Sequence, residues 1–215
     1  RKFHLARYQS LRQSCLCGSE ASGHGMQVFD LSQLLTLTGP PKTFSETAFY
    51  NGGGTVGNAH NIVINEDTGF AYIVGGNNSC SGGLRGLHMV NISTPTRPAF
   101  AGCYAGDGYV HDAHCVVYDG PDTKYTGREV CFCSNEDTVT IVDVTIKSAP
   151  VQLSRTSYNT SGYTHQGWSS EDHRYFVFGD EIDELAQGIN TKTYVMNVQN
   201  LGSPFVAGSY FGPSN

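Results

Sequence analysis

The sequence predicts an all-β fold: a β-propeller built from four-stranded antiparallel blades that repeat about every 50 residues. Composition is the first observation behind this prediction. Of the 215 residues 26 are Gly and only 15% are charged, whereas an ordinary soluble domain has about 7% Gly and about 25% charged residues. Helical bundles, coiled coils and disordered chains need more charged or helix-forming residues, so a turn-rich β-protein is left.

Three sequence markers that recur in phase are the second observation. The spacing Gly-x-x-His ends at His60, His111 and His165, in steps of 51 and 54 residues. An apolar strand that ends in Asp or Asn, and a Pro that opens the next apolar segment, follow at matching distances. They occur at Asp30, Asn91, Asp143 and Asn197, and at Pro98, Pro150 and Pro204. Three markers in phase indicate a structural repeat.

Each repeat divides into four short strand candidates rich in β-branched and aromatic residues. Residues 1–56 are irregular: 25–31 match the third-strand marker and 43–49 can form a fourth strand, which predicts a partial blade. The candidates that follow are 61–65, 70–75, 87–92 and 99–104; 114–119, 129–135, 138–144 and 151–158; and 165–169, 175–180, 193–198 and 205–211. The predicted blades of one propeller domain are therefore 57–107, 108–161 and 162–215.

Three full blades and a partial one do not show how the ring closes, since propellers typically have about 4 to 8 blades. We expect either a piece of a longer ring or closure through the terminal segments or another subunit. The first residues, Arg-Lys-Phe-His-Leu, lack the apolar stretch of a signal peptide and begin like a processed or partial chain.

Charge and hydropathy argue against a nucleic-acid partner and against a transmembrane segment. The formal net charge is −6 and the cationic residues are scattered, which argues against nucleic acid. No apolar run approaches the roughly 18 residues of a membrane span. Candidate N-glycosylation acceptors at Asn77, Asn91 and Asn159, together with seven Cys, favour an extracellular or cell-surface location.

Seven Cys leave at least one outside a disulfide if the others are oxidised. Cys80 precedes the third strand and Cys103 ends the fourth strand of one blade, which predicts a bridge within that blade. Cys115 and Cys131 lie on consecutive strands and are predicted to pair across a hairpin. Cys133 points to the same face as Cys131, so which of these two faces Cys115 is open.

The repeated His60, His111 and His165 are the strongest candidates for a binding site. Each lies three residues after a Gly and directly before the strand that is expected to be innermost, where equivalent positions fall on a circle about the axis. Three imidazoles there can bind Zn²⁺ or a similar ion with an open coordination position. Alternatively, they hydrogen-bond neighbouring blades and lock the blade interface. Asp112 and His114 are candidates for extra ligands or for groups that orient His111.

Other candidate positions favour structural roles. Residues 180–184 contain four carboxylates, of which Asp180 and Glu181 suit Ca²⁺, although a solvated acidic loop is the favoured interpretation. His173 lies in a turn and is expected to be solvated. His88 lies on a third strand, where a packing role is favoured.

Several short sequence motifs follow one another in the same order as in a known protein family. They lie at residues 59–69, 83–93, 109–114, 138–144 and 163–168. In these segments the chain resembles LVIVD-repeat proteins of the choice-of-anchor B type over about residues 56–211. The resemblance implies a secreted or surface-anchored β-propeller and implies no activity. The irregular first 56 residues depart from the family's usual pattern.

Nucleophile elbows, phosphate-binding loops and His-Glu-x-x-His helices do not occur in the sequence. We therefore expect an extracellular binding or structural module of a cell-surface or matrix assembly, whose partner is a protein, a glycan or another copy of the chain. The alternative is a metal-dependent hydrolase or lyase. Its His cluster would activate a water, with Asp112 or His114 as the acid/base.

Overall fold

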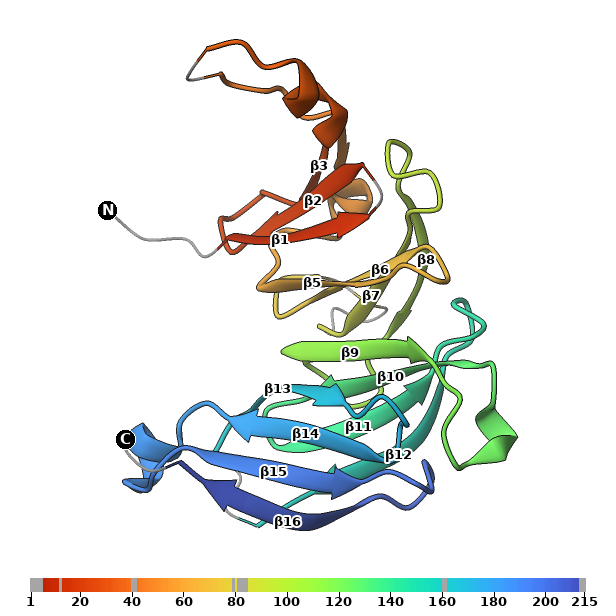
Figure 1. Cartoon of the computed structure of the whole chain (residues 1–215), viewed down its shortest axis with the longest axis vertical. Helices are drawn as coiled ribbons and strands as arrows, with labels where there is room; N and C mark the ends of the chain where they lie inside the picture. Colours follow the sequence, from red (N-terminus) through yellow and green to blue (C-terminus); the bar gives the residue numbers. More distant parts are fainter. Residues whose placement is uncertain are drawn as a thin grey trace. The chain divides into compact units, whose positions relative to one another are not determined.

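Sixteen strands in four antiparallel sheets make up the computed structural model, which describes residues 6–11, 13–39, 42–78, 80, 85–159 and 162–212. Every sheet contains four strands that neighbour one another in chain order, as the colours of Figure 1 show. This is the topology of propeller blades, so the predicted all-β fold class is confirmed. The sheets fall into two compact units, residues 1–103 and 104–215.

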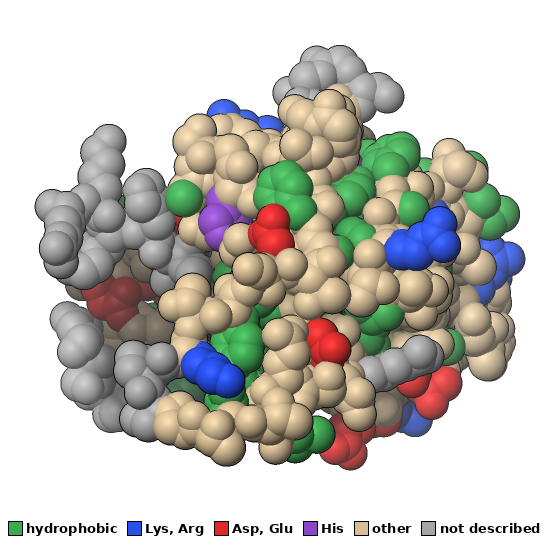
Figure 2. Space-filling view, turned by 90° about the horizontal axis from the view of Figure 1, so that it is seen from above, with side chains coloured by type: hydrophobic (Ala, Val, Ile, Leu, Met, Phe, Trp, Pro, Cys, Tyr) green, Lys and Arg blue, Asp and Glu red, His purple; other side chains and the backbone are tan. Residues whose placement is uncertain are grey.

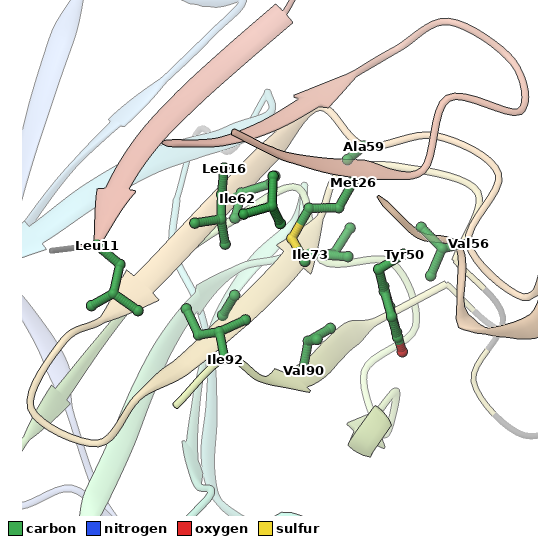
Figure 3. Close-up of a cluster of buried hydrophobic side chains, with 12 residues drawn as sticks. Leu11, Leu16, Met26, Tyr50, Val56, Ala59, Ile62, Ile73, Val90 and Ile92 are labelled. Atoms are coloured by element: carbon green, nitrogen blue, oxygen red, sulfur yellow. The ribbon is translucent and has the colours of Figure 1, made fainter. Parts of the chain in front are cut away.

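Unit 1 contains the first two sheets. Their strands are β1 (Ala6–Leu11), β2 (Ser14–Ser19), β3 (Met26–Asp30) and β4 (Ala48–Tyr50), and then β5 (Asn61–Asn65), β6 (Phe70–Val74), β7 (Leu87–Asn91) and β8 (Ala99–Tyr104). The two sheets share a core in which Leu16 and Met26 of the first sheet meet Ile62 and Ile73 of the second (Figure 3).

The segment predicted to be a partial blade therefore forms a complete four-stranded sheet. Its first two strands read Ala-Arg-Tyr-Gln-Ser-Leu and Ser-Cys-Leu-Cys-Gly-Ser, with few of the β-branched residues that indicate a strand. Pairing with the better-marked β3 places them in the sheet. The division of the chain into blades at residues 57, 108 and 162 stays a prediction.

Unit 2 contains the third and fourth sheets. Their strands are β9 (Asp112–Val117), β10 (Glu129–Ser134), β11 (Thr138–Asp143) and β12 (Val151–Ser157), and then β13 (Thr164–Ser169), β14 (Tyr175–Asp180), β15 (Lys192–Asn197) and β16 (Phe205–Phe211). An aromatic core joins them. Phe132 of β10 stacks on Phe176 of β14 with ring centroids 5.2 Å apart, and within the fourth sheet Phe178 of β14 stacks on Tyr194 of β15 at the same separation.

The first strands of successive sheets lie next to each other in both units. β1 contacts β5 in unit 1, and β9 contacts β13 in unit 2. Neighbouring first strands are what a radial stack of blades requires, because those strands lie nearest the axis. Residues at the start of a first strand are therefore brought towards those of the next sheet.

Two disulfides join the Cys pairs that the sequence predicted. Cys80 is bonded to Cys103, and Cys115 is bonded to Cys131, which lies directly opposite it in the β9–β10 register. Cys133 lies opposite Ala113 instead and is fully buried. Burial raises the pKa of the Cys133 thiol, so this residue stays protonated and unreactive.

Gly167 on β13 marks a place where the fourth sheet leaves no room for a side chain. A Cβ at Gly167 would lie 2.4 Å from Cζ of Phe176, whereas a Cβ at Gly179 on β14 would meet no heavy atom within 4 Å. We expect Gly167→Ala to lower the free energy of unfolding by about 1–3 kcal/mol. Gly179→Ala should change it by less than about 0.5 kcal/mol. Urea denaturation measures both, and equal losses in the two variants would contradict this packing.

Candidate metal centre

His111 and His165 lie at the start of the first strands of the two sheets of unit 2. His111 directly precedes β9, and its backbone N–H donates to the carbonyl of Ser134 at the end of β10 (2.8 Å). His165 is the second residue of β13, next to Thr164, which pairs with Asp180 at the end of β14. The Gly-x-x-His repeat therefore places His111 just before the first strand of its sheet and His165 just inside the first strand of the next sheet.

His60 occupies the same place in the second sheet of unit 1. It directly precedes β5, and its N–H donates to the carbonyl of Val74 at the end of β6 (3.1 Å). Its imidazole Nδ1 lies 2.7 Å from Oε1 of Glu20, and 15% of the His60 side chain is exposed. A carboxylate hydrogen-bonded to one ring nitrogen orients the imidazole, so the other ring nitrogen is the one that can bind an ion.

The imidazoles of His111 and His165 approach each other within unit 2. Their ring centroids are 5.1 Å apart, and a ligand nitrogen of each lies within 4.8 Å of one on the other. His111 is buried and His165 is half-buried. Two imidazole nitrogens that share an ion lie about 2.0–2.1 Å from it, so small side-chain rotations would let this pair bind one cation.

Two tyrosine hydroxyls surround Nδ1 of His111. The hydroxyl of Tyr163 lies 3.1 Å from that nitrogen, and that of Tyr109 lies 3.4 Å from it. Burial, followed by the nearby Tyr109 and Glu136, raises the pKa of Tyr163, so this phenol stays neutral. If Nδ1–H donates to the Tyr163 oxygen, Nε2 is the nitrogen that presents a lone pair.

A carboxylate stands beside the second imidazole. Oε2 of the exposed Glu181 lies 3.8 Å from Nε2 of His165. A carboxylate at this distance can orient the ring, or can bind a cation held by the two imidazoles.

The neighbouring Asp180 has a structural role. It is buried, and its carboxylate accepts hydrogen bonds from the N–H groups of Gly162 (2.7 Å) and Tyr163 (2.8 Å). It also accepts one from the Tyr158 hydroxyl (3.0 Å). Asp180 thereby holds the segment that leads into His165.

The expectation of a solvated acidic loop at 180–184 is therefore wrong for two of its carboxylates. Asp180 and Asp183 are both buried, and Oδ2 of Asp183 accepts the Lys192 N–H (2.9 Å). Backbone amides donate to both carboxylates, and buried carboxylates need such donors. Calcium binding by Asp180 and Glu181 stays a prediction, and the amide contacts of Asp180 give it no support.

One backbone hydrogen bond fixes the two sheets of unit 2 beside the His pair. The carbonyl of Glu136, in the turn after β10, accepts the N–H of Thr164 at 2.5 Å. Glu136 has a φ of 67°, a left-handed conformation that costs free energy for a non-Gly residue. Because Thr164 directly precedes His165, this bond sets the position of His165 relative to the preceding sheet.

The contacts of His114 favour a packing role. It is buried, it stacks on Trp168 with centroids 3.9 Å apart, and its Nδ1 accepts the Ser169 N–H at 3.1 Å. Burial lowers the pKa of His114 to about 4. Asp112, the other acid/base candidate, is half-buried and accepts the N–H of Ala113 at 2.7 Å.

His88 has the packing role that was favoured for it, and His173 departs from its prediction. The imidazole Nε2 of His88 lies 2.8 Å from the Tyr50 hydroxyl, and burial lowers its pKa to about 4. His173 was expected to be solvated, but only 12% of its side chain is exposed. The backbone of His173 has a φ of 50°. Its ring stacks on Tyr118, and its Nδ1 lies 2.7 Å from Oδ1 of Asp119.

The candidate glycosylation sites differ in exposure. Asn77 and Asn159 are exposed, and Asn91 is half-buried with its side-chain oxygen accepting from Ser93. Residues 79, 160 and 161 of two sequons lie outside the described residues. Glycosylation at the three positions stays a prediction.

Several groups that belong to the centre were missed from the sequence. Tyr109 and Tyr163 each lie two residues before a repeated His, so Gly-Tyr-x-His was a detectable signal, although only in two of the three repeats. Glu181 was considered only as a Ca²⁺ ligand and Glu136 was not singled out, because their proximity to His165 and Thr164 depends on how the turns fold.

Taken together, the four sheets and the His–Tyr–Glu cluster define an all-β protein of blade-like sheets with a candidate cation site at its first strands. Within the described ranges, no helix has the length and apolarity to cross a bilayer. On the face shown in Figure 2, the Lys and Arg side chains are dispersed rather than gathered into a basic patch.

Neither a protein-family model nor a curated protein matches the chain. Among solved structures, the chain is similar to the β-propeller domain of Cps50 (Swd1) from Myceliophteria thermophila, with 11% sequence identity and a TM-score of 0.47. The similarity covers 94% of this chain and 56% of that one, so the chain spans little more than half of the solved chain. The fold class depends on the four sheets themselves.

Acid should destabilise the protein through its buried neutral histidines. The pKa of His114 is about 4 in the folded state and about 6.5 when unfolded. The unfolded state therefore binds a proton first, so the stabilisation is fully present above about pH 6.5 and is lost as the pH falls to about 4. The expected loss is on the order of 3 kcal/mol. His114→Gln should flatten the fall in urea-derived stability between these pH values, and an unchanged slope would exclude a buried neutral His114.

Proposed function

We propose that this chain is an extracellular β-propeller module that holds a zinc-like divalent cation at His60, His111 and His165. The observation that carries the proposal is the convergence of His111 and His165 in unit 2. Imidazole nitrogens are ligands that Zn²⁺ and similar borderline ions prefer. The Tyr163 hydroxyl on Nδ1 of His111 and the Glu181 carboxylate near His165 are partners that typically orient metal-binding imidazoles.

The third ligand, His60, is proposed from the repeat. His60 and His111 each directly precede a first strand, and each donates its N–H to the last residue of the second strand of its own sheet. In a radial array, such equivalent positions face the axis. Three imidazoles would leave one coordination position for water or for an oxygen of a partner.

The extracellular part of the proposal rests on the cysteines and the sequons. Cys80–Cys103 and Cys115–Cys131 form disulfides, which persist in oxidising compartments. The resemblance to LVIVD-repeat proteins of the choice-of-anchor B type supports the same location. A protein or glycan at the cell surface is the proposed partner.

A metal-dependent hydrolase or lyase is the second candidate function. The Glu181 carboxylate beside the imidazole pair favours it, because a cation with an open position can activate water and a nearby carboxylate can accept its proton. The packing of His114 against Trp168 makes that residue a weaker acid/base candidate than the sequence indicated.

Metal content tests the proposed function directly. The purified chain, dialysed against zinc and then against buffer, should retain about one equivalent of Zn²⁺ by elemental analysis. His111→Ala, His165→Ala and His60→Ala should each lose it while circular dichroism shows the fold retained. His173→Ala, which removes a His that contacts Asp119 and Tyr118, is the matched control. A wild-type chain without metal would overturn the proposal. If His111→Ala and His165→Ala lose the Zn²⁺ but His60→Ala retains it, the site is restricted to unit 2.

The Tyr163 hydroxyl should tune the affinity without being a ligand. Tyr163→Phe removes the oxygen that lies 3.1 Å from Nδ1 of His111, so we expect Zn²⁺ affinity to fall by about 10- to 100-fold. Competition with a chromogenic chelator measures this affinity. Tyr175→Phe, at an exposed position of β14, should leave it unchanged. Equal affinities for Tyr163→Phe and wild type would contradict the orienting role.

Activity would separate the two candidate functions. A zinc-loaded chain that hydrolyses ester or phosphoester probes, and loses this activity in Glu181→Gln with the metal retained, would establish the hydrolase. A zinc-loaded chain inert toward these probes would favour the binding module.

A further inference from the structure

Asp107 lies in the loop that leads into β9, four residues before His111. Only 9% of its side chain is exposed. Its Oδ2 accepts hydrogen bonds from the hydroxyls of Thr138 and Thr140 on β11, both at 2.6 Å. Its Oδ1 accepts one from Nε of Arg155 on β12. A single carboxylate therefore ties this loop to the two outer strands of the third sheet.

The same donors keep the Asp107 carboxylate ionised. Burial by itself raises the pKa of a carboxyl group, but the hydrogen bonds from the two threonines and Arg155 outweigh it, so the pKa of Asp107 lies below its ordinary value. An ionised carboxylate with little access to water stays where its donors are, because leaving them would cost several hydrogen bonds to a charged group. Asp107 is therefore a fixed point of the loop.

Two further hydrogen bonds hold the chain between Asp107 and His111. Nδ2 of Asn135, a buried residue directly after β10, donates to the carbonyl of Tyr109 at 2.9 Å. The N–H of His111 donates to the carbonyl of Ser134 at 2.8 Å. The loop is thus anchored at three points, of which Asp107 is the one that reaches β11 and β12.

The segment before the second imidazole of unit 2 is held in a comparable way. The buried carboxylate of Asp180 accepts the N–H groups of Gly162 and Tyr163, just before His165. Asp180 belongs to the sheet and bonds to the segment, whereas Asp107 belongs to the segment and bonds to the sheet. Each of the two imidazoles that approach each other therefore follows a segment fixed by one carboxylate of low exposure.

We propose that Asp107 is a positioning residue, which places His111 opposite His165 by tying the loop to β11 and β12. Without its carboxylate the loop keeps only the anchors at Asn135 and Ser134, and the His111 imidazole shifts. A ligand that is already in place lowers the entropy cost of binding an ion. The effect on metal affinity rests on the proposed function, whereas the position of His111 in the metal-free chain does not.

NMR of the metal-free full chain tests the position of His111. Asp107→Asn keeps the size of the side chain but removes its charge and one acceptor oxygen, so the ring-proton chemical shifts of His111 should change. Asp137→Asn is the matched control, because Asp137 accepts from the same Arg155 at 3.1 Å but is 71% exposed and lies outside the loop. Shifts of His111 that stay unchanged in Asp107→Asn, or that change equally in both variants, would overturn the proposal.

Zinc affinity, measured by competition with a chromogenic chelator, is the second readout. It should fall about 10- to 100-fold in Asp107→Asn and stay at the wild-type value in Asp137→Asn. A wild-type chain that binds no zinc would overturn the proposed function alone, because the NMR measurement is made without metal. A zinc-binding chain whose affinity is the same in Asp107→Asn as in wild type would overturn the positioning role.

Thr140 separates positioning from stability and keeps the test valid if Asp107→Asn fails to fold. Thr140→Val removes the hydroxyl that donates to Asp107, so His111 should shift and zinc affinity should fall. Thr140→Ser keeps the hydroxyl and should retain both wild-type properties, although the loss of a buried methyl group lowers the free energy of unfolding. Equal His111 shifts in the Val and Ser variants would contradict the role of Asp107.

Discussion

The packing of one four-stranded sheet onto the next is the constraint on which the rest of this structure depends. In unit 2 this packing is carried by stacked aromatic rings, with Phe132 on Phe176 and His114 on Trp168. Burial of apolar area is non-directional, whereas ring stacking and strand register restrict how two sheets can meet. The relative position of the third and fourth sheets is therefore well determined, and with it the position of everything at the start of their first strands.

The candidate metal centre follows from that packing. His111 and His165 are far apart in sequence, but each lies at the start of a first strand, directly before β9 or as the second residue of β13, and these first strands adjoin. The bond from Thr164 N–H to the Glu136 carbonyl and the clamp made by Asp180 then hold the segment around His165. Such pre-positioning lowers the entropy cost of binding an ion. A site placed between sheets also couples any bound cation to the sheet interface.

The same constraint explains which site residues could be recognised in advance. The repeated His were detectable because a repeat places equivalent residues at equivalent positions. Asp180 and His173 were misjudged as solvated because acidic and polar turn residues are usually exposed, and burial of their side chains depends on how the turns fold over the sheets. Glu181 and Glu136 could not be assigned to the centre, since their neighbours are distant in sequence.

The sequence by itself determined the all-β class and most strands, because alternating apolar residues, turn residues and in-phase markers are local properties of the chain. The choice of Cys131 over Cys133 as the partner of Cys115 needed the register of β9 and β10. It did not determine β1 and β2, whose residues have weak strand preference and depend on pairing with β3. Only the tertiary structure decided that Tyr163 faces His111 and that His114 serves packing against Trp168. These features depend on which sheet covers which face, and that is a property of long-range contacts that no local pattern contains.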